Sequence, residues 1–401
     1  MRIAFFVQHL LCGGVEKTLL TLTRRLANDG HHVMIYVIRR SGGFISSVPN
    51  GVTLAEIQLP NDIRRFLPVG GTKMTVRDDL SHHHYWMAIH HLIAHKFGKS
   101  GFAELNVDFD RIANLSEEYD IAVNYHLHSP FLVRYLSEKV TAKRKYSWIH
   151  NDFSTTGYEI AALRQYLTCC SGFFGVSQQI VSEFSQILPE FADRTQVAHN
   201  LIPADDILRQ AEEFVPTEFE SNNDRLNILT VGRIEEQKGY DIAIEVCRKL
   251  AADNLIFKWF VLGDGSLRQR YESLVKKLNL QEHFIFLGTR LNPYPYFKHC
   301  DLYVQTSRHE GYVTTVTEAK LFARPIVCTD VSGAREQLTD GVSGEIAKID
   351  ADDIYNRVSS IIKDKYLRDK YSAALSECGC SNDEDWLAVF NDKAAANEWN
   401  K

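Results

Sequence analysis

Short apolar runs alternate with amphipathic stretches along this chain, and this alternation restricts the folds that it can adopt. The apolar run at 3–7 precedes Gly13-Gly14 and an amphipathic stretch that carries Leu19, Leu22 and Leu26. A second apolar run follows at 32–38. A buried strand, a glycine turn, a helix and another strand form the opening of a Rossmann-like parallel sheet. We therefore predict an α/β fold.

The same pattern restarts in the second half of the chain. It predicts strands at 226–231, 257–262 and 283–287, with helices at 240–252 and 266–278 between them. Residues 204–224 are acidic and end in Ser221-Asn222-Asn223-Asp224, which indicates a linker. A chain of 401 residues is also long for one domain. We predict four parts: a Rossmann-like domain at 1–203, an acidic linker at 204–224, a Rossmann-like domain at 225–385 and a helix at 386–401.

Composition excludes several classes of function. The net charge of −6 gives no reason to expect nucleic acid, and no run of about 20 apolar residues could cross a membrane. The absence of a targeting segment favours the cytoplasm. The full G-x-G-x-x-G fingerprint is missing, which argues against bound NAD or FAD, and no cofactor is predicted.

Histidines are concentrated in the first half, where 13 of the 16 precede residue 203. The group at 82–95 includes His91 and His95, whose spacing would suit two metal ligands on a helix, but no acidic residue or cysteine accompanies them. We therefore predict a polar helix there and no metal. Two predicted strands, at 120–125 and 145–149, also end in histidine. We therefore expect this half to gain positive charge as the pH falls through ~6.5.

A strand-to-helix corner follows the apolar run at 302–306. Thr315 is predicted to begin a helix, with Glu318 at the capping-box spacing. The unpaired amides and the dipole of a helix start favour an anion. Glu310 on the approach to the helix must then face something else, and the hydroxyl groups of a polar ligand are the best candidates.

Glu310 and Glu318 are separated by seven residues, and this segment resembles the Glu-x7-Glu signature of the retaining, nucleotide-sugar-dependent glycosyltransferases of family 4. Residues 226–345 resemble the family closely through four further motifs: Val231-Gly232-Arg233-x4-Lys238-Gly239, Leu262-Gly263-Asp264-Gly265, Asn292-Pro293-Tyr294 and Gly333-x2-Glu336. The first half resembles it more loosely, through Gly13-Gly14-Val15-Glu16-Lys17, His126-x-His128 and Trp148-Ile149-His150-Asn151-Asp152.

The resemblance implies a GT-B fold, in which two Rossmann-like domains face each other across a cleft and the final segment packs back on the first domain. It implies that Arg233 and Lys238, after the turn at Gly232, bind the diphosphate of the donor. A guanidinium fork and an ammonium suit that charge. It further implies that Glu310 lies against the donor sugar and Glu318 binds the ribose. The remaining donor-binding positions are the amides of Gly311, Tyr312, Val313, Thr314 and Thr315, the nucleobase loop with Asn292 and Tyr294, and the backbone at Gly13 and Gly14.

Each of these residues also has a purely structural interpretation. Arg233 and Lys238 could be ordinary surface side chains, and Glu318 could close a capping box onto Thr315. The resemblance leaves open whether His128 or His150 is the catalytic histidine, and we rank His128 first. Asp108-Phe109-Asp110 matches the D-x-D pattern of metal-dependent transferases, but we interpret it as solvated surface, because two cations would make a metal unnecessary.

These observations together predict a retaining, metal-independent glycosyltransferase. Its donor would be a nucleoside-diphosphate sugar, with a UDP-sugar expected. Its acceptor would be a saccharide or a lipid-linked saccharide of polysaccharide or lipopolysaccharide biosynthesis. Basic clusters at Arg39-Arg40 and Lys143-Arg144-Lys145 could attract anionic lipid at the inner face of the cell membrane. The alternatives are an epimerase or a pyridoxal-phosphate-dependent phosphorylase of the same architecture, and a non-catalytic nucleotide-sugar-binding or scaffold protein.

Overall fold

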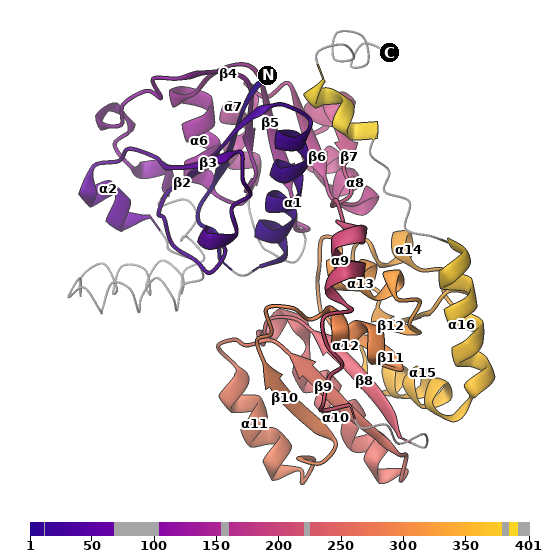
Figure 1. Ribbon diagram of the computed structural model, residues 1–401. Helices are drawn as coiled ribbons and strands as arrows, with labels where there is room; N and C mark the ends of the chain where they lie inside the picture. Colours follow the sequence, from indigo (N-terminus) through magenta and orange to yellow (C-terminus); the bar gives the residue numbers. More distant parts are fainter. Residues whose placement is uncertain (12, 68–103, 154–159, 220–224, 379–384, 392–401) are drawn as a thin grey trace. The chain divides into compact units, whose positions relative to one another are not determined.

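The computed structural model describes residues 1–11, 13–67, 104–153, 160–219, 225–378 and 385–391 (Figure 1). The chain divides into two units, one formed by Met1–Leu201 with Asp383–Lys401 and the other by Ile202–Asn382. The histidine-rich segment at 82–95 lies outside the described residues, so its predicted helix is not tested.

The first unit is built on a parallel sheet. In its described part the strand order is β3-β2-β1-β4-β5-β6-β7. The strands are β1 (Arg2–Val7), β2 (His32–Val37), β3 (Val52–Glu56), β4 (Glu118–Asn124), β5 (Thr141–Ile149), β6 (Gly172–Gly175) and β7 (Thr195–Val197). The central strand β1 is buried from Ile3 to Val7, as expected for a strand covered on both faces.

Helices connect these strands, as parallel pairing requires. They are α1 (Gly14–Asn28), α2 (Asn61–Phe66), α6 (Pro130–Lys139), α7 (Arg164–Leu167) and α8 (Gln178–Ile187). Sequence features explain where α6 begins: the Ser129 hydroxyl accepts a hydrogen bond from the Leu132 amide, and Pro130 occupies the first turn, where no amide proton is needed.

The second unit has its own parallel sheet, with the strand order β10-β9-β8-β11-β12-β13 in the described residues. Its strands are β8 (Leu226–Val231), β9 (Phe257–Leu262), β10 (Phe284–Gly288), β11 (Leu302–Gln305), β12 (Ile326–Thr329) and β13 (Glu345–Ala347). Its helices are α9 (Ala204–Gln210), α10 (Tyr240–Ala252), α11 (Arg268–Lys277), α12 (Tyr294–His299), α13 (Thr314–Leu321), α14 (Ala334–Gln337), α15 (Ala351–Lys363) and α16 (Lys365–Cys378). Because the order reverses between β8 and β11, the loops after these two strands meet at a topological switch point.

A linker was predicted at 204–224, but residues 204–219 do not form one. This segment belongs to the second unit, where Ile207, Ala211 and Phe219 are buried in the core. The Phe219 ring packs 4.7 Å from that of Phe260 on β9. The acidic residues of the segment lie between these apolar positions, so its charge concealed an amphipathic stretch. Residues 220–224 are not described.

The last described residues pack on the first unit. Residues Asp385–Phe390 form a single 3-10 segment, labelled η7, and the rest of the helix predicted at 386–401 lies outside the described residues. The Trp386 ring lies edge-on to Trp148 of β5 at 5.2 Å, and Phe390 lies 6.2 Å from Phe5 of β1. Residues Trp386 and Phe390 therefore form part of the same core as β1 and β5.

Candidate active site

Two loops of the second unit are joined at the switch point of its sheet. The loop after β8 contains Gly239, whose φ of +63° and lack of a Cβ allow it to approach β11, since a Cβ there would lie 2.1 Å from the Thr306 carbonyl oxygen. The Thr306 hydroxyl donates to the carbonyls of Lys238 and Gly239. The Arg308 amide donates to the Gln237 carbonyl at 2.7 Å. These contacts fix the loop after β8 against the loop after β11.

Lys238 and Glu310 meet where the two loops touch. The Lys238 ammonium donates to Glu310 Oε1 at 2.5 Å, and both side chains are largely buried. The Ser307 hydroxyl donates to the same oxygen at 2.6 Å. The structure thus brings together two predicted catalytic residues that are 72 positions apart in the sequence. Only one of the three ammonium protons is used by Glu310, so Lys238 can still donate to a ligand.

Arg233 lies in the same loop as Lys238 but is exposed. Among the described residues its guanidinium has no hydrogen-bonding or ion-pair partner. The turn before it is tight, because the Tyr240 hydroxyl donates to the Gly232 carbonyl, and a Cβ on Gly263 would lie 1.9 Å from that carbonyl oxygen. A rigid turn therefore presents an available cation.

The start of α13 differs from the prediction in one respect. Val313 is the N-cap and no side chain caps the helix, so the predicted capping box of Thr315 and Glu318 is wrong. The helix begins at Thr314, which places Thr315 inside the first turn. The amides of Gly311, Val313, Thr314 and Thr315 donate to no group in the described part of the chain, as expected for an uncapped helix start. Open amides and the helix dipole favour an anion here.

The other predicted donor-binding residues of the second unit are buried or make contacts within that unit. Glu318 and Tyr294 are buried, and Tyr294 belongs to the core of the second unit. The Asn292 amide donates to the Gln210 carbonyl and to Glu213, which ties the predicted nucleobase loop to the segment after α9. The partly exposed Tyr312 ring leaves no room for a Cβ on Gly333.

In the first unit, Gly13 and Gly14 begin α1. A Cβ on Gly13 would lie 2.4 Å from a carboxylate oxygen of Glu16, so this glycine makes room for Glu16. Glu16 is buried, and its other oxygen lies 3.4 Å from His9 Nδ1. Burial acts to raise the pKa of Glu16, but His9 and His126 more than offset this effect and the pKa is lowered. Sequence reasoning missed His9 and Glu16, although the carboxylate of Glu16, two residues after Gly14, was a visible signal.

Both candidate histidines lie at strand ends of the first unit. His128 follows β4 and stacks on Phe153 at 5.4 Å, while His150 follows β5 and lies 4.5 Å from the Tyr125 ring. Burial lowers the pKa of His128 to about 4, as it does for His126, and lowers that of His150 well below its ordinary value. The gain of positive charge expected near pH 6.5 therefore does not come from His126, His128 or His150. They are neutral at pH 7, and each can donate or accept a hydrogen bond.

The D-x-D pattern, Asp108-Phe109-Asp110, has both of its carboxylates on the surface of the first unit. Asp108 and Asp110 are exposed, the Asp108 side chain accepts from the Asp110 amide, and Arg111 pairs with Asp62. No group of three or more acidic, histidine or cysteine side chains in the described residues could hold a metal ion.

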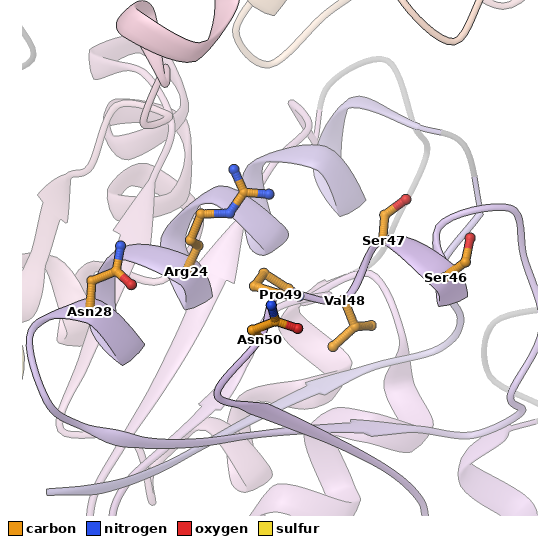
Figure 2. Close-up of a pocket in the computed structure, with 7 residues that line it drawn as sticks. All are labelled: Arg24, Asn28, Ser46, Ser47, Val48, Pro49 and Asn50. Atoms are coloured by element: carbon orange, nitrogen blue, oxygen red, sulfur yellow. The ribbon is translucent and has the colours of Figure 1, made fainter.

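A surface hollow of about 390 Å³ in the first unit is formed by α1 and the segment before β3 (Figure 2). Its lining residues are Arg24, Asn28, Ser46, Ser47, Val48, Pro49 and Asn50, none of them a predicted site residue. Figure 2 shows these side chains spread along an open surface.

Comparison with known proteins finds a match to a family model and similar proteins. Residues 212–377 match the family model described as Glycosyl transferases group 1. The chain is 30% identical over 199 residues to the N-acetylgalactosamine-N,N'-diacetylbacillosaminyl-diphospho-undecaprenol 4-alpha-N-acetylgalactosaminyltransferase of Campylobacter jejuni, covering 49% of this chain and 51% of the relative. It is 28% identical over 142 residues to the lipopolysaccharide core biosynthesis glycosyltransferase LpsE of Rhizobium meliloti, covering 35% of this chain and 41% of the relative. The chain thus spans about half the length of these curated relatives, or less.

The solved structures extend the similarity to both units. Anabaena HepE, in complex with UDP and glucose, aligns with a TM-score of 0.66 at 17% identity over 94% of each chain. This likeness shows the fold and confirms the predicted α/β class. Residues 212–377 therefore match the glycosyl transferases group 1 model, and the chain has the GT-B fold of its structural neighbours.

Proposed function

We propose that this protein transfers a sugar, with retention of configuration and without a metal, from a nucleoside-diphosphate sugar to a saccharide or lipid-linked saccharide. The observation that carries the proposal is the contact of Lys238 with Glu310 close to the open start of α13. A cation, a carboxylate and free amides suit the diphosphate and the sugar of one donor.

Charge stabilisation is the main chemical task in such a transfer. The leaving diphosphate gains negative charge as the glycosidic bond breaks, and groups already oriented toward that charge lower the barrier most. We assign this role to Arg233, Lys238 and the open amides of Gly311, Val313, Thr314 and Thr315. Glu310 accepts hydrogen bonds from the sugar, and a neutral His128 or His150 contacts the sugar or the acceptor hydroxyl.

The departing phosphate is the base that we favour for the acceptor hydroxyl. Retention of configuration requires the acceptor to approach the donor sugar from the face that the phosphate leaves, so the phosphate lies beside the acceptor hydroxyl. The phosphate also becomes more basic as it departs. A covalent route through Glu310 is disfavoured because Lys238 and Ser307 already bind one carboxylate oxygen. Mass spectrometry of the protein trapped with a donor analogue tests this choice, and a glycosylated Glu310 peptide would overturn it.

A UDP-sugar is the proposed donor, and a bacterial surface saccharide is the proposed class of acceptor. The Campylobacter relative is an N-acetylgalactosaminyltransferase whose name includes diphospho-undecaprenol, the Rhizobium relative is named for lipopolysaccharide core biosynthesis, and the Anabaena structure holds UDP. We therefore place UDP-N-acetylhexosamines first among donors and lipid-linked saccharides first among acceptors.

Membrane contact is a further part of the proposal. No helix in the described residues is long and apolar enough to span a bilayer. The basic clusters proposed for anionic lipid are partly engaged within the protein, since the Arg39 guanidinium donates to carbonyls at the end of α2 and Lys143 pairs with Asp120. Co-sedimentation with anionic liposomes at low and high salt tests this contact, and equal recovery with neutral liposomes would remove it.

A thermal-shift screen against nucleoside diphosphates and their sugars tests the donor site. A ligand at 100 times its Kd adds about 2.7 kcal/mol to the free energy of unfolding. We expect UDP and one UDP-sugar to raise the Tm, and release of UDP from that donor in the presence of acceptor. Binding without turnover on any acceptor would favour the non-catalytic alternative, and no binding at all would overturn the proposal.

A further inference from the structure

A chain of buried hydrogen bonds runs through the second unit to Glu310. The Tyr303 hydroxyl donates to Gln305 Oε1 at 2.7 Å, and Gln305 Nε2 donates to the Ser307 hydroxyl at 2.6 Å. Ser307 in turn donates to Glu310 Oε1 at 2.6 Å. Tyr303 and Ser307 are fully buried, and Gln305 is 1% exposed. We call Tyr303, Gln305 and Ser307 the β11 relay.

Strand geometry explains why these three side chains line up. Alternate residues of a strand point to the same face, so Tyr303 and Gln305 of β11 are neighbours, and Ser307 continues the spacing past the end of the strand. Burying an amide and two hydroxyls is unfavourable unless they are hydrogen-bonded. Here each relay group has a partner, and satisfied buried networks of this kind hold their members in one arrangement.

The relay has a direction. The Tyr303 hydroxyl binds the Gln305 carbonyl oxygen, which turns the Gln305 amino group toward Ser307. Because Ser307 accepts that hydrogen bond, its single hydroxyl proton is left for Glu310. Lys238 donates to the same carboxylate oxygen. Oε1 is thus held by two donors, whereas Oε2 receives no hydrogen bond from the residues that the structure describes.

We propose that the β11 relay consists of positioning residues, which fix Oε1 of Glu310 so that Oε2 faces a hydroxyl of the donor sugar. This inference rests on the proposed function, in which Glu310 lies against that sugar. The three buried side chains of the β11 relay would thus affect the reaction only by orienting Glu310.

Ser307→Ala tests the relay at its last link. We expect kcat/KM for UDP-N-acetylgalactosamine, or for the UDP-sugar that the thermal-shift screen identifies, to fall roughly 10- to 100-fold, because misplacing a reacting group by about 1 Å has costs of this size. The Kd of UDP should change less than about twofold, since UDP lacks the sugar that Glu310 contacts. Tyr303→Phe removes one distant oxygen and should give a loss in the same direction of roughly two- to fivefold.

A double variant and a control variant distinguish a positioning role from a loss of stability. In Glu310→Gln, adding Ser307→Ala should cause no further loss of kcat/KM, because residues that act as a unit are non-additive. Thr230→Val is the matched control: the Thr230 hydroxyl is also buried, donates to the Val304 carbonyl and accepts from Trp259, but does not touch Glu310. It should lower Tm and leave kcat/KM unchanged.

The outcomes distinguish the two proposals. Turnover by the natural protein with an unchanged kcat/KM in Ser307→Ala, or equal losses with and without Glu310, would overturn the relay alone. A fall of kcat/KM in Thr230→Val as large as in Ser307→Ala would also overturn it. Failure of the natural protein to bind UDP or to turn over any UDP-sugar would overturn the proposed function and the relay with it.

Discussion

Arg233 and Lys238 stand five residues apart, but the structure gives them different surroundings. Lys238 is largely buried and paired with Glu310, whereas Arg233 is exposed and has no partner among the described residues. An isolated guanidinium at the end of a buried strand can turn to a ligand without breaking an existing contact. Under the proposed function, Lys238 shares its ammonium between Glu310 and the diphosphate.

Arg233→Ala should therefore reduce catalysis and leave the fold intact. Loss of one oriented charge that stabilises the transition state costs about 10²- to 10³-fold in rate. Arg233→Lys should recover part of this loss, because a lysine restores the charge but not the planar fork. Steady-state kinetics measure both. The matched control is Arg248→Ala, an exposed arginine of α10 that pairs with Glu245. Equal activity of Arg233→Ala and the control would contradict the assignment.

Gly239 offers a second test at the residue scale. Gly239→Ala combines a left-handed φ with a Cβ 2.1 Å from the Thr306 carbonyl oxygen, so the loop that carries Lys238 must shift. Gly341 has a similar φ of +71°, but no atom lies within 4 Å of the position that its Cβ would take, which makes Gly341→Ala the matched control. We expect the control to lose about 1 kcal/mol of stability and Gly239→Ala to lose several, together with activity. Urea unfolding measures the difference, and equal losses would contradict the steric argument.

At the scale of elements, buried and partly buried ionisable groups lie at the ends of β1, β4 and β5. His126 and His128 follow β4, His150 follows β5, and Glu16 in the first turn of α1 interacts with His126. A separate buried carboxylate, Glu104, accepts from the Phe131 amide at the start of α6. Since such groups bind protons differently in the folded and unfolded chain, they link the stability of the first unit to pH.

The sign of this link follows from the directions of the shifts. Burial lowers the pKa of His126 and His128 from 6.5 to about 4, and lowers that of His150, so the unfolded chain binds more protons in this range and acid favours unfolding. Burial raises the pKa of Glu104 to about 7, which has the opposite effect but involves one group instead of three. The first unit should lose stability as the pH falls from about 6.5 to 4.5.

Hydrogen exchange at pH 6.5, 5.5 and 4.5, corrected for the intrinsic exchange rate, measures this loss separately for each unit. Peptides from β4 and β5 should lose protection by on the order of 1 kcal/mol per pH unit, after allowance for the partial exposure of His126 and His128. His150→Gln should reduce that slope, whereas His283→Gln in the second unit should not. A pH-independent first unit would show that these histidines are not buried neutral groups.

At the scale of the whole molecule, the chain crosses between its units twice. Residues 202–382 form the second unit, and the chain then returns to the first, where Trp386 and Phe390 contact β5 and β1. Both rings are buried, so the first unit cannot complete its core from residues 1–201 alone. The stability of the first unit therefore depends on residues at the far end of the sequence.

Deletion of residues 383–401 should destabilise the first unit selectively. Removing one large buried aromatic side chain costs about 3–5 kcal/mol, and this deletion removes two. Protection of β1 and β5 against hydrogen exchange should fall, while that of β8 and β9 stays unchanged. Trp386→Ala should reproduce most of the effect, and Lys365→Ala, at an exposed position of α16, serves as the control. Loss of protection in both units alike would contradict the assignment of this segment to the first unit.

The sequence by itself determined most elements of both sheets, because apolar runs, glycine turns and helical periodicity are local signals. It predicted β8, α10 and β9 at their observed bounds, and it singled out Arg233, Lys238 and Glu310. It misplaced the cap of α13 by two residues, since a Thr-x-x-Glu pattern does not reveal which residue takes the first helical conformation.

Only the tertiary structure decided which distant groups meet. The sheet order places β8 beside β11, and this pairing brings Lys238 within reach of Glu310 across 72 residues. The same is true of the β11 relay, the Glu16–His9 contact and the packing of residues 204–219 and 386–390. Periodicity shows that a side chain is buried, but its partner depends on strand order and loop geometry, which are set by the packing of the whole chain.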